Sequence, residues 1–323
     1  MRSKSTADTT TPPGASRRDF LHRAAGLTAG LAAAAGATTA GANGPEKLSR
    51  LLPTISLGPH KLTRLIIGGN PIYGHSHFNR LYSQHLIDFH TPERVVELLR
   101  ACELSGINAW QNSYSERTLA DIDRVREAGV SFHWLCLGKT DWDEHPELIE
   151  HVAKRKPIGI APHGALAERL HRQNKIPVLL ELLKRIRSTG VQVGLSAHDP
   201  ALIELSEEQG WDVDYYMCCQ YYLTRPRNEI QKILGEIPMG EIYLPTDRER
   251  MLSVVRAARK PCLVYKVLAA GRANLSPAGI REAFQFTLSH IKPTDAMLVG
   301  MFQEFGDQVK MNADIVQDLC GKG

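Results

Sequence analysis

The sequence predicts an α/β fold, a single (β/α)8 TIM barrel, and three observations support this prediction. Eight short apolar runs, each typical of a buried parallel strand, alternate strictly with helical patterns. The alternating units occupy roughly the 250 residues that such a barrel requires. No G-x-G-x-x-G motif follows a predicted strand, whereas a doubly wound open sheet, the competing fold, carries such a phosphate loop. The nearest match, 68–71, contains Pro71, which disfavours a helix start of that type.

The 323-residue chain has enough apolar side chains for one large domain. Its hydrophobic content is 43% and its charged content 23%, values that argue against wholesale disorder. We expect the barrel to cover residues 57–323. After the N-terminal region, no stretch approaches the roughly 20 continuous apolar residues of a membrane span.

The N-terminal region is typical of an export signal rather than of a fold. Arg17 and Arg18 precede a run of small apolar residues, 24–37, which is followed by Ala-x-Ala sites. This order predicts a twin-arginine signal peptide over 1–42 and a linker over 43–56. The twin-arginine export machinery would be a partner, and the mature protein would be periplasmic or secreted, with no stable membrane anchor after cleavage. The alternative is a disordered tail with a chance arginine pair.

The charge balance does not indicate a nucleic-acid partner. The chain carries 39 basic and 35 acidic residues, but five of the basic and two of the acidic residues lie within 1–42. The remainder, with 34 against 33, is nearly neutral. The six cysteines match neither a zinc motif nor a disulfide framework. Four of them, at 136, 218, 219 and 262, fall in predicted strands and are expected to be small core residues.

Each predicted strand is a short apolar run that ends at a glycine, a proline or a polar residue. The first ends at Gly69, before Asn70 and Pro71. The eight predicted strands are 65–69, 107–111, 130–139, 157–162, 191–196, 213–220, 262–266 and 296–300.

Helical patterns follow these strands, and several begin with recognisable caps. Thr91 precedes Pro92, Asp199 precedes Pro200, and 246–249 forms a capping box. The predicted helices are 91–105, 115–128, 147–153, 176–188, 199–209, 246–259, 276–290 and 304–319.

Two connections are too long for simple turns. The first, 70–90, is rich in histidine, and the second, 221–245, carries tyrosine and arginine side chains. Loops of this length in a compact domain are usually functional or disordered. We expect 70–90 to form either a lid over the barrel mouth or a solvated polar loop. The aromatic, arginine and histidine side chains of both connections suit a polar, hydroxylated ligand.

Polar side chains end most of the predicted strands, and in a barrel these ends converge on one face. Glutamines and serines there can simply cap backbone groups. A histidine ending an apolar strand, as His163 does, can exchange protons near neutral pH. Lys139 and Lys266 at the mouth would be paired, would bind an anion, or would act in catalysis. The candidates are Asn70, Gln111, Tyr114, Lys139, Asp141, His163, Ser196, His198, Gln220 and Lys266.

From Leu57 onward the chain resembles the aldo-keto reductase superfamily. The similarity is carried by 57–58 and 66–69 at the opening, 106–116 around the second strand, 194–196 in the fifth, and 295–300 with Asn312 near the C-terminus. The order of these matches along the barrel carries the resemblance, rather than any single motif.

The resemblance implies an oxidoreductase that transfers hydride between NADP or NAD and a small-molecule carbonyl, sugar or polyol. Tyr114 would donate the proton, Lys139 would lower the pKa of Tyr114, and His163 would hydrogen-bond the carbonyl oxygen. Gln111 stands where the family has its aspartate, so Lys139 would lack the usual carboxylate partner. Cofactor-binding positions implied by the resemblance are Ser196, Gln220, Lys266, Gly300 and Asn312, and Gln308 stands where an arginine is expected.

Two other functions use the same barrel without redox chemistry. Lys139 or Lys266 could form a Schiff base in a lyase or isomerase, or Asp141, His163 and His198 could hold a divalent metal. The barrel could also bind a sugar without catalysis.

Overall fold

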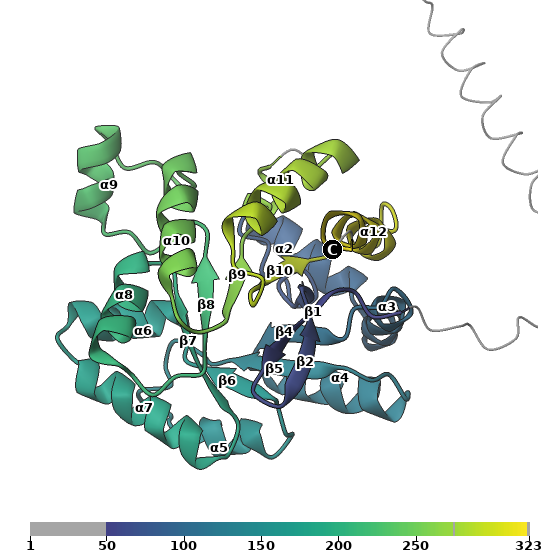
Figure 1. Ribbon diagram of the computed structural model, residues 1–323, viewed down its shortest axis with the longest axis horizontal. Helices are drawn as coiled ribbons and strands as arrows, with labels where there is room; N and C mark the ends of the chain where they lie inside the picture. The colour runs from purple at the N-terminus through teal and green to yellow at the C-terminus, as the bar shows by residue number, and fades with distance from the viewer. Residues whose placement is uncertain (1–49, 274, 322–323) are drawn as a thin grey trace, which may run out of the picture. The chain divides into compact units, whose positions relative to one another are not determined.

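The structure, a computed structural model, describes residues 50–273 and 275–321 (Figure 1). The predicted signal peptide, 1–42, lies outside the described residues, as does the first half of the predicted linker, 43–49. No helix within the described part of the chain has the length and apolar character needed to cross a membrane.

Eight parallel strands close into a barrel, which confirms the predicted fold (Figure 1). The strands follow one another around the barrel in chain order, and the last pairs with the first, with Met297 opposite Leu65. The barrel strands are β3 (Leu65–Gly68), β4 (Ala109–Ser113), β5 (His133–Leu137), β6 (Gly159–Ala161), β7 (Gln192–Ala197), β8 (Tyr215–Cys219), β9 (Cys262–Tyr265) and β10 (Ala296–Gly300).

The predicted helices surround the barrel, with ends that differ by a few residues from the predicted ones. Three expected caps form, since the side chains of Thr91, Asp199 and Ser276 accept backbone N–H groups at the starts of their helices. The capping box predicted at 246–249 does not form, because that helix begins at Pro245 with Leu244 as its N-cap and no side-chain cap bond. These helices are α3 (Pro92–Leu104), α4 (Glu116–Glu127), α5 (Leu148–Ala153), α7 (Ile176–Ser188), α8 (Pro200–Gln209), α10 (Pro245–Ala257), α11 (Pro277–His290) and α12 (Gln308–Cys320).

Several elements differ from the prediction. The 70–90 connection is not one long loop, because its second half forms α2 (Arg80–Phe89), capped by Asn79. The 221–245 connection contains α9 (Arg227–Leu234), which buries none of its side chains. A further helix, α6 (Gly164–Arg172), follows β6 directly, with His163 as its N-cap. A short 3₁₀ turn, η1 (Ala269–Gly271), lies after β9.

An antiparallel hairpin, β1 (Thr54–Leu57) and β2 (His60–Thr63), closes the amino end of the barrel. Its apolar side chains join the cluster that fills the interior, and the Asn108 side chain, just before β4, bonds both Thr63 N and Lys61 O at 2.9 Å. The end of the predicted linker therefore belongs to β1. Because this end is packed shut, chemistry is expected at the opposite end.

Side chains alternate between the barrel interior and the helical shell along each strand. Interior space is tight, because a Cβ atom on Gly194 would lie 2.4 Å from the Tyr215 ring. Shell-facing Trp134 donates its ring N–H to Asn112 Oδ1 at 2.8 Å. The four strand cysteines are buried and free, as expected of core residues.

Candidate functional site

The candidate site lies at the carboxyl ends of the strands, the barrel mouth. Five segments contribute its titratable side chains: the loop after β3, the start of α6, the β7–α8 turn, the 221–245 connection, and the stretch after β9. The side chains that interact there are His75, His77, His163, Glu168, His198, Glu241, Lys266 and Arg272.

Lys266 follows β9 directly and is the least constrained of these groups. Its amine has no hydrogen bond or ion pair with any described residue. Burial lowers the pKa of Lys266 to about 8, the Arg272 charge acts in the same direction, and Cys219 and Glu241 partly oppose the shift. A lysine in this state holds a useful fraction of neutral, nucleophilic amine near neutral pH.

The backbone at Lys266 is in a left-handed conformation. Its φ is 64°, and Ala269 and Ala270 in the following turn have φ values of 49° and 52°. Side chains other than glycine adopt this region at a cost, and such strain gathers at functional sites. Strict alternation would send Lys266 outward with Val264. The left-handed turn instead brings the amine near Cys219 and Glu241.

His163 lies at the end of β6 and is held as a neutral hydrogen-bond donor. Its Nδ1 accepts the backbone N–H of Ala165 at 3.1 Å, so the ring proton is on Nε2. Burial, followed by the neighbouring charge of His198, lowers the pKa of His163 to about 4. The ring therefore stays uncharged at neutral pH.

Glu168 on α6 is 1% exposed and organises the next two loops. It accepts the backbone N–H of Asp199 at 2.8 Å, and also the N–H of His198 and the hydroxyl of Thr224. Burial by itself would raise the pKa of Glu168, but the hydrogen bonds and charge of His198, with Thr224 and the Asp199 N–H, lower it overall. The carboxylate thereby fixes the His198 ring, whose centroid lies 5.8 Å from that of Tyr265.

A second acid–histidine pair fastens the two long connections together. His77 Nδ1 lies 2.6 Å from Glu241 Oε1, its Nε2 lies 3.1 Å from Asn70 Nδ2, and Tyr243 donates its hydroxyl to Glu241 at 2.7 Å. Burial opposes ionisation of Glu241, yet the bonds from His77 and Tyr243 lower its pKa to about 2. The loop after β3 thus contacts the 221–245 connection.

His75 carries an exposed imidazole with no hydrogen-bond partner among the described residues. Partial desolvation, then the charges of His77 and Lys266, lower its pKa. His75 also acts on the charge of His163. His75 therefore interacts electrostatically with both Lys266 and His163, and its ring is free to bind or transfer a proton.

The predicted tetrad does not assemble as one group. Tyr114 is 6% exposed and lies in the helical shell, with its ring 6.3 Å from Trp142 and its hydroxyl donated to Glu116 at 2.5 Å. Lys139 is exposed, with its amine 5.2 Å from the Tyr114 ring centroid. The prediction that these two residues share the mouth with His163 is wrong in its geometry, because Tyr114 faces outward like Asn112. Gln111, by contrast, is buried on β4, the strand that leads to Tyr114.

The cofactor residues implied by the resemblance are also dispersed. Ser196 lies inside the barrel, 3.4 Å from the Tyr265 hydroxyl, and Lys266 lies at the mouth. Gln220 is in the helical shell, where its amide donates to Thr287 at 2.8 Å and accepts from Arg248 at 3.2 Å. Asn312 is buried on α12, and Gly300 is exposed at the end of β10. Since the Gln220 amide is used within the shell, these five residues do not fit one nicotinamide site.

The metal alternative lacks a suitable set of ligands. Within residues 50–273 and 275–321, no group of three or more His, Cys, Asp or Glu side chains is arranged to hold an ion. Asp141, His163 and His198 therefore do not form the divalent site that the sequence suggested.

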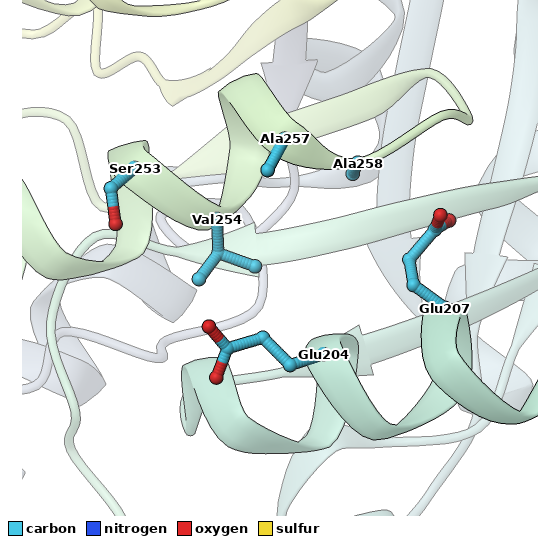
Figure 2. Close-up of a pocket in the computed structure, with 6 residues that line it drawn as sticks. All are labelled: Glu204, Glu207, Ser253, Val254, Ala257 and Ala258. Atoms are coloured by element: carbon cyan, nitrogen blue, oxygen red, sulfur yellow. The ribbon is translucent and has the colours of Figure 1, made fainter.

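A pocket on the outer surface lies between α8 and α10, away from the mouth. Figure 2 shows the two glutamates of α8 facing the small side chains of α10. Both carboxylates are already paired, Glu204 with Arg250 and Glu207 with Arg259 at 2.8 Å. We assign no chemistry to it.

Residues that sequence reasoning missed include Glu168 and Glu241, the two carboxylates that position the histidines. Glu168 fell in the stretch left unassigned between the predicted strand 157–162 and the predicted helix 176–188, and Glu241 in a connection without periodicity. For Glu168 the missed signal was the spacing of Leu166, Ala167 and Leu170, which marks an amphipathic helix.

Comparison with known proteins supports the TIM-barrel fold but no particular family or function. No protein-family model matches the sequence, and no curated protein matches it. The chain is similar in structure to a truncated 3-deoxy-D-arabino-heptulosonate 7-phosphate synthase from Thermotoga maritima, at 14% identity, covering 83% of this chain and 91% of that one, with a TM-score of 0.50. Dihydropteroate synthase from Thermus thermophilus matches at 13% identity over 82% and 97% of the two chains, with a TM-score of 0.46.

Orotidine 5'-phosphate decarboxylase from Pyrococcus horikoshii matches at 10% identity, covering 79% of this chain and 98% of that one, with a TM-score of 0.43. At 14% identity, the likeness to the synthase from Thermotoga maritima shows a shared TIM barrel alone. The resemblance to aldo-keto reductases gains no support from these structures.

Proposed function

We propose that the protein is a non-redox barrel enzyme, a lyase or isomerase, in which Lys266 forms a Schiff base with a carbonyl substrate. The observation that carries this proposal is the position of Lys266 at the end of β9. There a half-buried amine without a hydrogen bond sits on a left-handed backbone. Nucleophilic lysines need such desolvated surroundings, with a neutral amine available at neutral pH.

The covalent step balances without an added oxidant or reductant. The neutral amine attacks the carbonyl carbon, an N–C bond forms, and a proton moves from nitrogen to oxygen, which gives a carbinolamine. A further proton delivered to the hydroxyl lets it leave as water, and a positively charged iminium remains. The iminium accepts the electron pair of an adjacent C–H or C–C bond, the proton passes to a base or the carbon fragment leaves as a carbonyl compound, and a neutral enamine forms. Protonation of the enamine on carbon restores an iminium, and attack of water on that iminium releases the product and returns the amine.

Two histidines suit the proton transfers that this step requires. His75 has a free, exposed ring near Lys266, so it can deliver a proton to the departing hydroxyl and later remove one from water. His163 is kept neutral with its proton on Nε2, so it can donate a hydrogen bond to a substrate oxygen. Glu168 acts by positioning, because it fixes His198 at the same face.

Borohydride trapping tests the proposal directly. The protein is incubated with a panel of aldehydes and ketones, reduced, and measured by intact mass and peptide mapping. We expect a stable adduct on Lys266, loss of that adduct in Lys266→Met, and its persistence in Lys310→Ala, which alters an exposed lysine paired with Asp314 on α12. An adduct that maps only to Lys139, or none with any carbonyl, contradicts the proposal.

The second candidate function is that of an oxidoreductase, which requires nicotinamide binding. It is the weaker one because the Tyr114 phenol is committed to Glu116 in the helical shell. Fluorescence titration with NADPH and NADH decides between the two functions. Saturable binding together with hydride transfer to a carbonyl would favour the oxidoreductase. A barrel that bound sugars but neither trapped carbonyls nor turned over would be a binding protein.

We also propose that residues 1–42 direct export by the twin-arginine route, on the strength of the sequence pattern alone. Replacing Arg17 and Arg18 together with lysine should keep the precursor inside the cell while the folded barrel remains intact. Fractionation in a bacterial host, with the same barrel behind a general secretory signal for comparison, measures this. Unchanged export of the double variant would remove the assignment.

A further inference from the structure

Arg272 stands beside the proposed nucleophile and lacks a carboxylate partner. Its guanidinium lies 4.5 Å from the Phe78 ring centroid and 4.3 Å from that of Tyr243, so two aromatic faces hold it. One Nη donates to the backbone carbonyl of His77 at 2.7 Å. Its remaining donors have no partner among the described residues, and the side chain is exposed at the mouth.

Neither nearby carboxylate forms an ion pair with Arg272, because the oxygens of Glu241 and Glu168 accept hydrogen bonds from other groups. Glu241 has one oxygen with His77 and the other with Tyr243. Glu168 takes its donors from the His198 turn and from Thr224. Among the residues that the structure describes, Arg272 and Lys266 are therefore positive groups at the mouth that form no ion pair.

We infer that Arg272 is an anion anchor, and that the substrate of the proposed reaction carries a carboxylate or phosphate group a short distance from its reacting carbonyl. A guanidinium clamped between two rings keeps its planar donor edge available, which suits two-pronged recognition of either oxyanion. With its anionic group bound to Arg272, the substrate would be oriented so that its carbonyl points toward Lys266. This inference rests on the proposed function for the identity of the reacting group, but not for anion binding itself.

Its test is calorimetric titration of the full protein, without borohydride, against three probes. Pyruvate supplies a carboxylate, dihydroxyacetone phosphate supplies a phosphate, and dihydroxyacetone is the uncharged comparison. We expect at least one anion to bind, and Arg272→Gln to weaken it about tenfold or more, the usual effect of losing a charge-assisted pair. Arg272→Lys should recover part of the loss. Arg281→Gln, which removes an exposed arginine paired with Asp318 on the outer helices, should bind as the parent does.

The outcomes separate this inference from the proposed function. Anion binding that persists in Lys266→Met but falls in Arg272→Gln supports the anchor even where no adduct is trapped. Equal binding of the anion by Arg272→Gln and the parent overturns it, as does binding of dihydroxyacetone alone. The ratio of the pyruvate and phosphate affinities identifies which oxyanion the mouth prefers.

Discussion

Two lysines end strands of the same barrel, yet their surroundings differ in almost every respect. Lys139, after β5, is exposed and rests against the ring of Tyr114, which belongs to the helical shell. Lys266, after β9, is half-buried, lies on a left-handed backbone, and is surrounded by Cys219 and other mouth groups. The comparison teaches that position at a strand end is insufficient, because desolvation and backbone direction decide which amine is reactive.

The largest expected difference between the two lysines is in carbonyl trapping. Lys266→Met should lower the yield of reduced adduct by at least about a hundredfold, since this amine is the nucleophile of the proposed reaction. Lys139→Met should lower it by less than about twofold. Both variants are measured by intact mass after borohydride treatment. Equal losses of adduct in the two variants would contradict the predicted difference between the two lysines.

The pH dependence of trapping should identify the amine that reacts. With a pKa of about 8 for Lys266, the neutral fraction, and hence the rate of adduct formation, rises about tenfold from pH 7 to pH 9 and then levels off. An ordinary lysine would still be gaining rate above pH 10. Initial rates across this range, with reductant stability controlled, provide the measurement, and a rate that climbs without a plateau would contradict the assignment.

Stability between pH 6.5 and pH 4 should depend on His163. Its pKa in the folded protein is about 4, below the ordinary value of 6.5, so in this window the unfolded chain binds the extra proton. The free energy of unfolding therefore falls as pH drops, by about 1–2 kcal/mol from this residue after allowance for its partial exposure.

Comparing His163→Asn with the parent isolates that contribution, because His75, His90 and His133 also have lowered pKa values and act in the same window. Denaturant unfolding at pH 4.5 and pH 7 is sufficient. A parent and a variant with equal pH sensitivity would show that His163 is not held neutral.

Substitution of the two lysines should also change the free energy of unfolding by different amounts. Lys266→Met is expected to raise the free energy of unfolding by about 1 kcal/mol at pH 7, because it removes a partly desolvated charge. Lys139→Met should stay within about 0.5 kcal/mol. Urea unfolding measures both, and a destabilised Lys266→Met would mean that the amine has a structural partner.

The smallest expected effect is that of Tyr114→Phe on chemistry. It removes a hydroxyl bonded to Glu116, so trapping at Lys266 should change by less than about twofold and stability by about 1 kcal/mol. A large loss of activity would instead favour a catalytic phenol.

Sequence reasoning reached the barrel because buried parallel strands and capped helices leave strong local patterns. It misplaced Tyr114, although the two-residue period of a strand already sends 110, 112 and 114 to the same outer side. The same rule places Gln220 with Cys218 in the shell. At these positions the strand period, and not the family resemblance, predicts the side that the structure shows.

Other features of the mouth could not be read from the sequence. The left-handed turn at Lys266 is not signalled by glycine or asparagine at that position, so the period-two rule fails there without warning. The pairing of His77 with Glu241 joins residues 164 positions apart, in connections that lack periodicity. Such contacts depend on the closed barrel, which brings distant loops to one rim.

The β1–β2 hairpin has a consequence for how molecules would reach the proposed site. Because it packs the amino end with apolar side chains, the candidate site in the described part of the chain is approached from the opposite rim. In the proposed reaction, substrate would enter and product would leave across that same rim. Product that stays bound would therefore compete with incoming substrate, and turnover would slow as product accumulates even far from equilibrium.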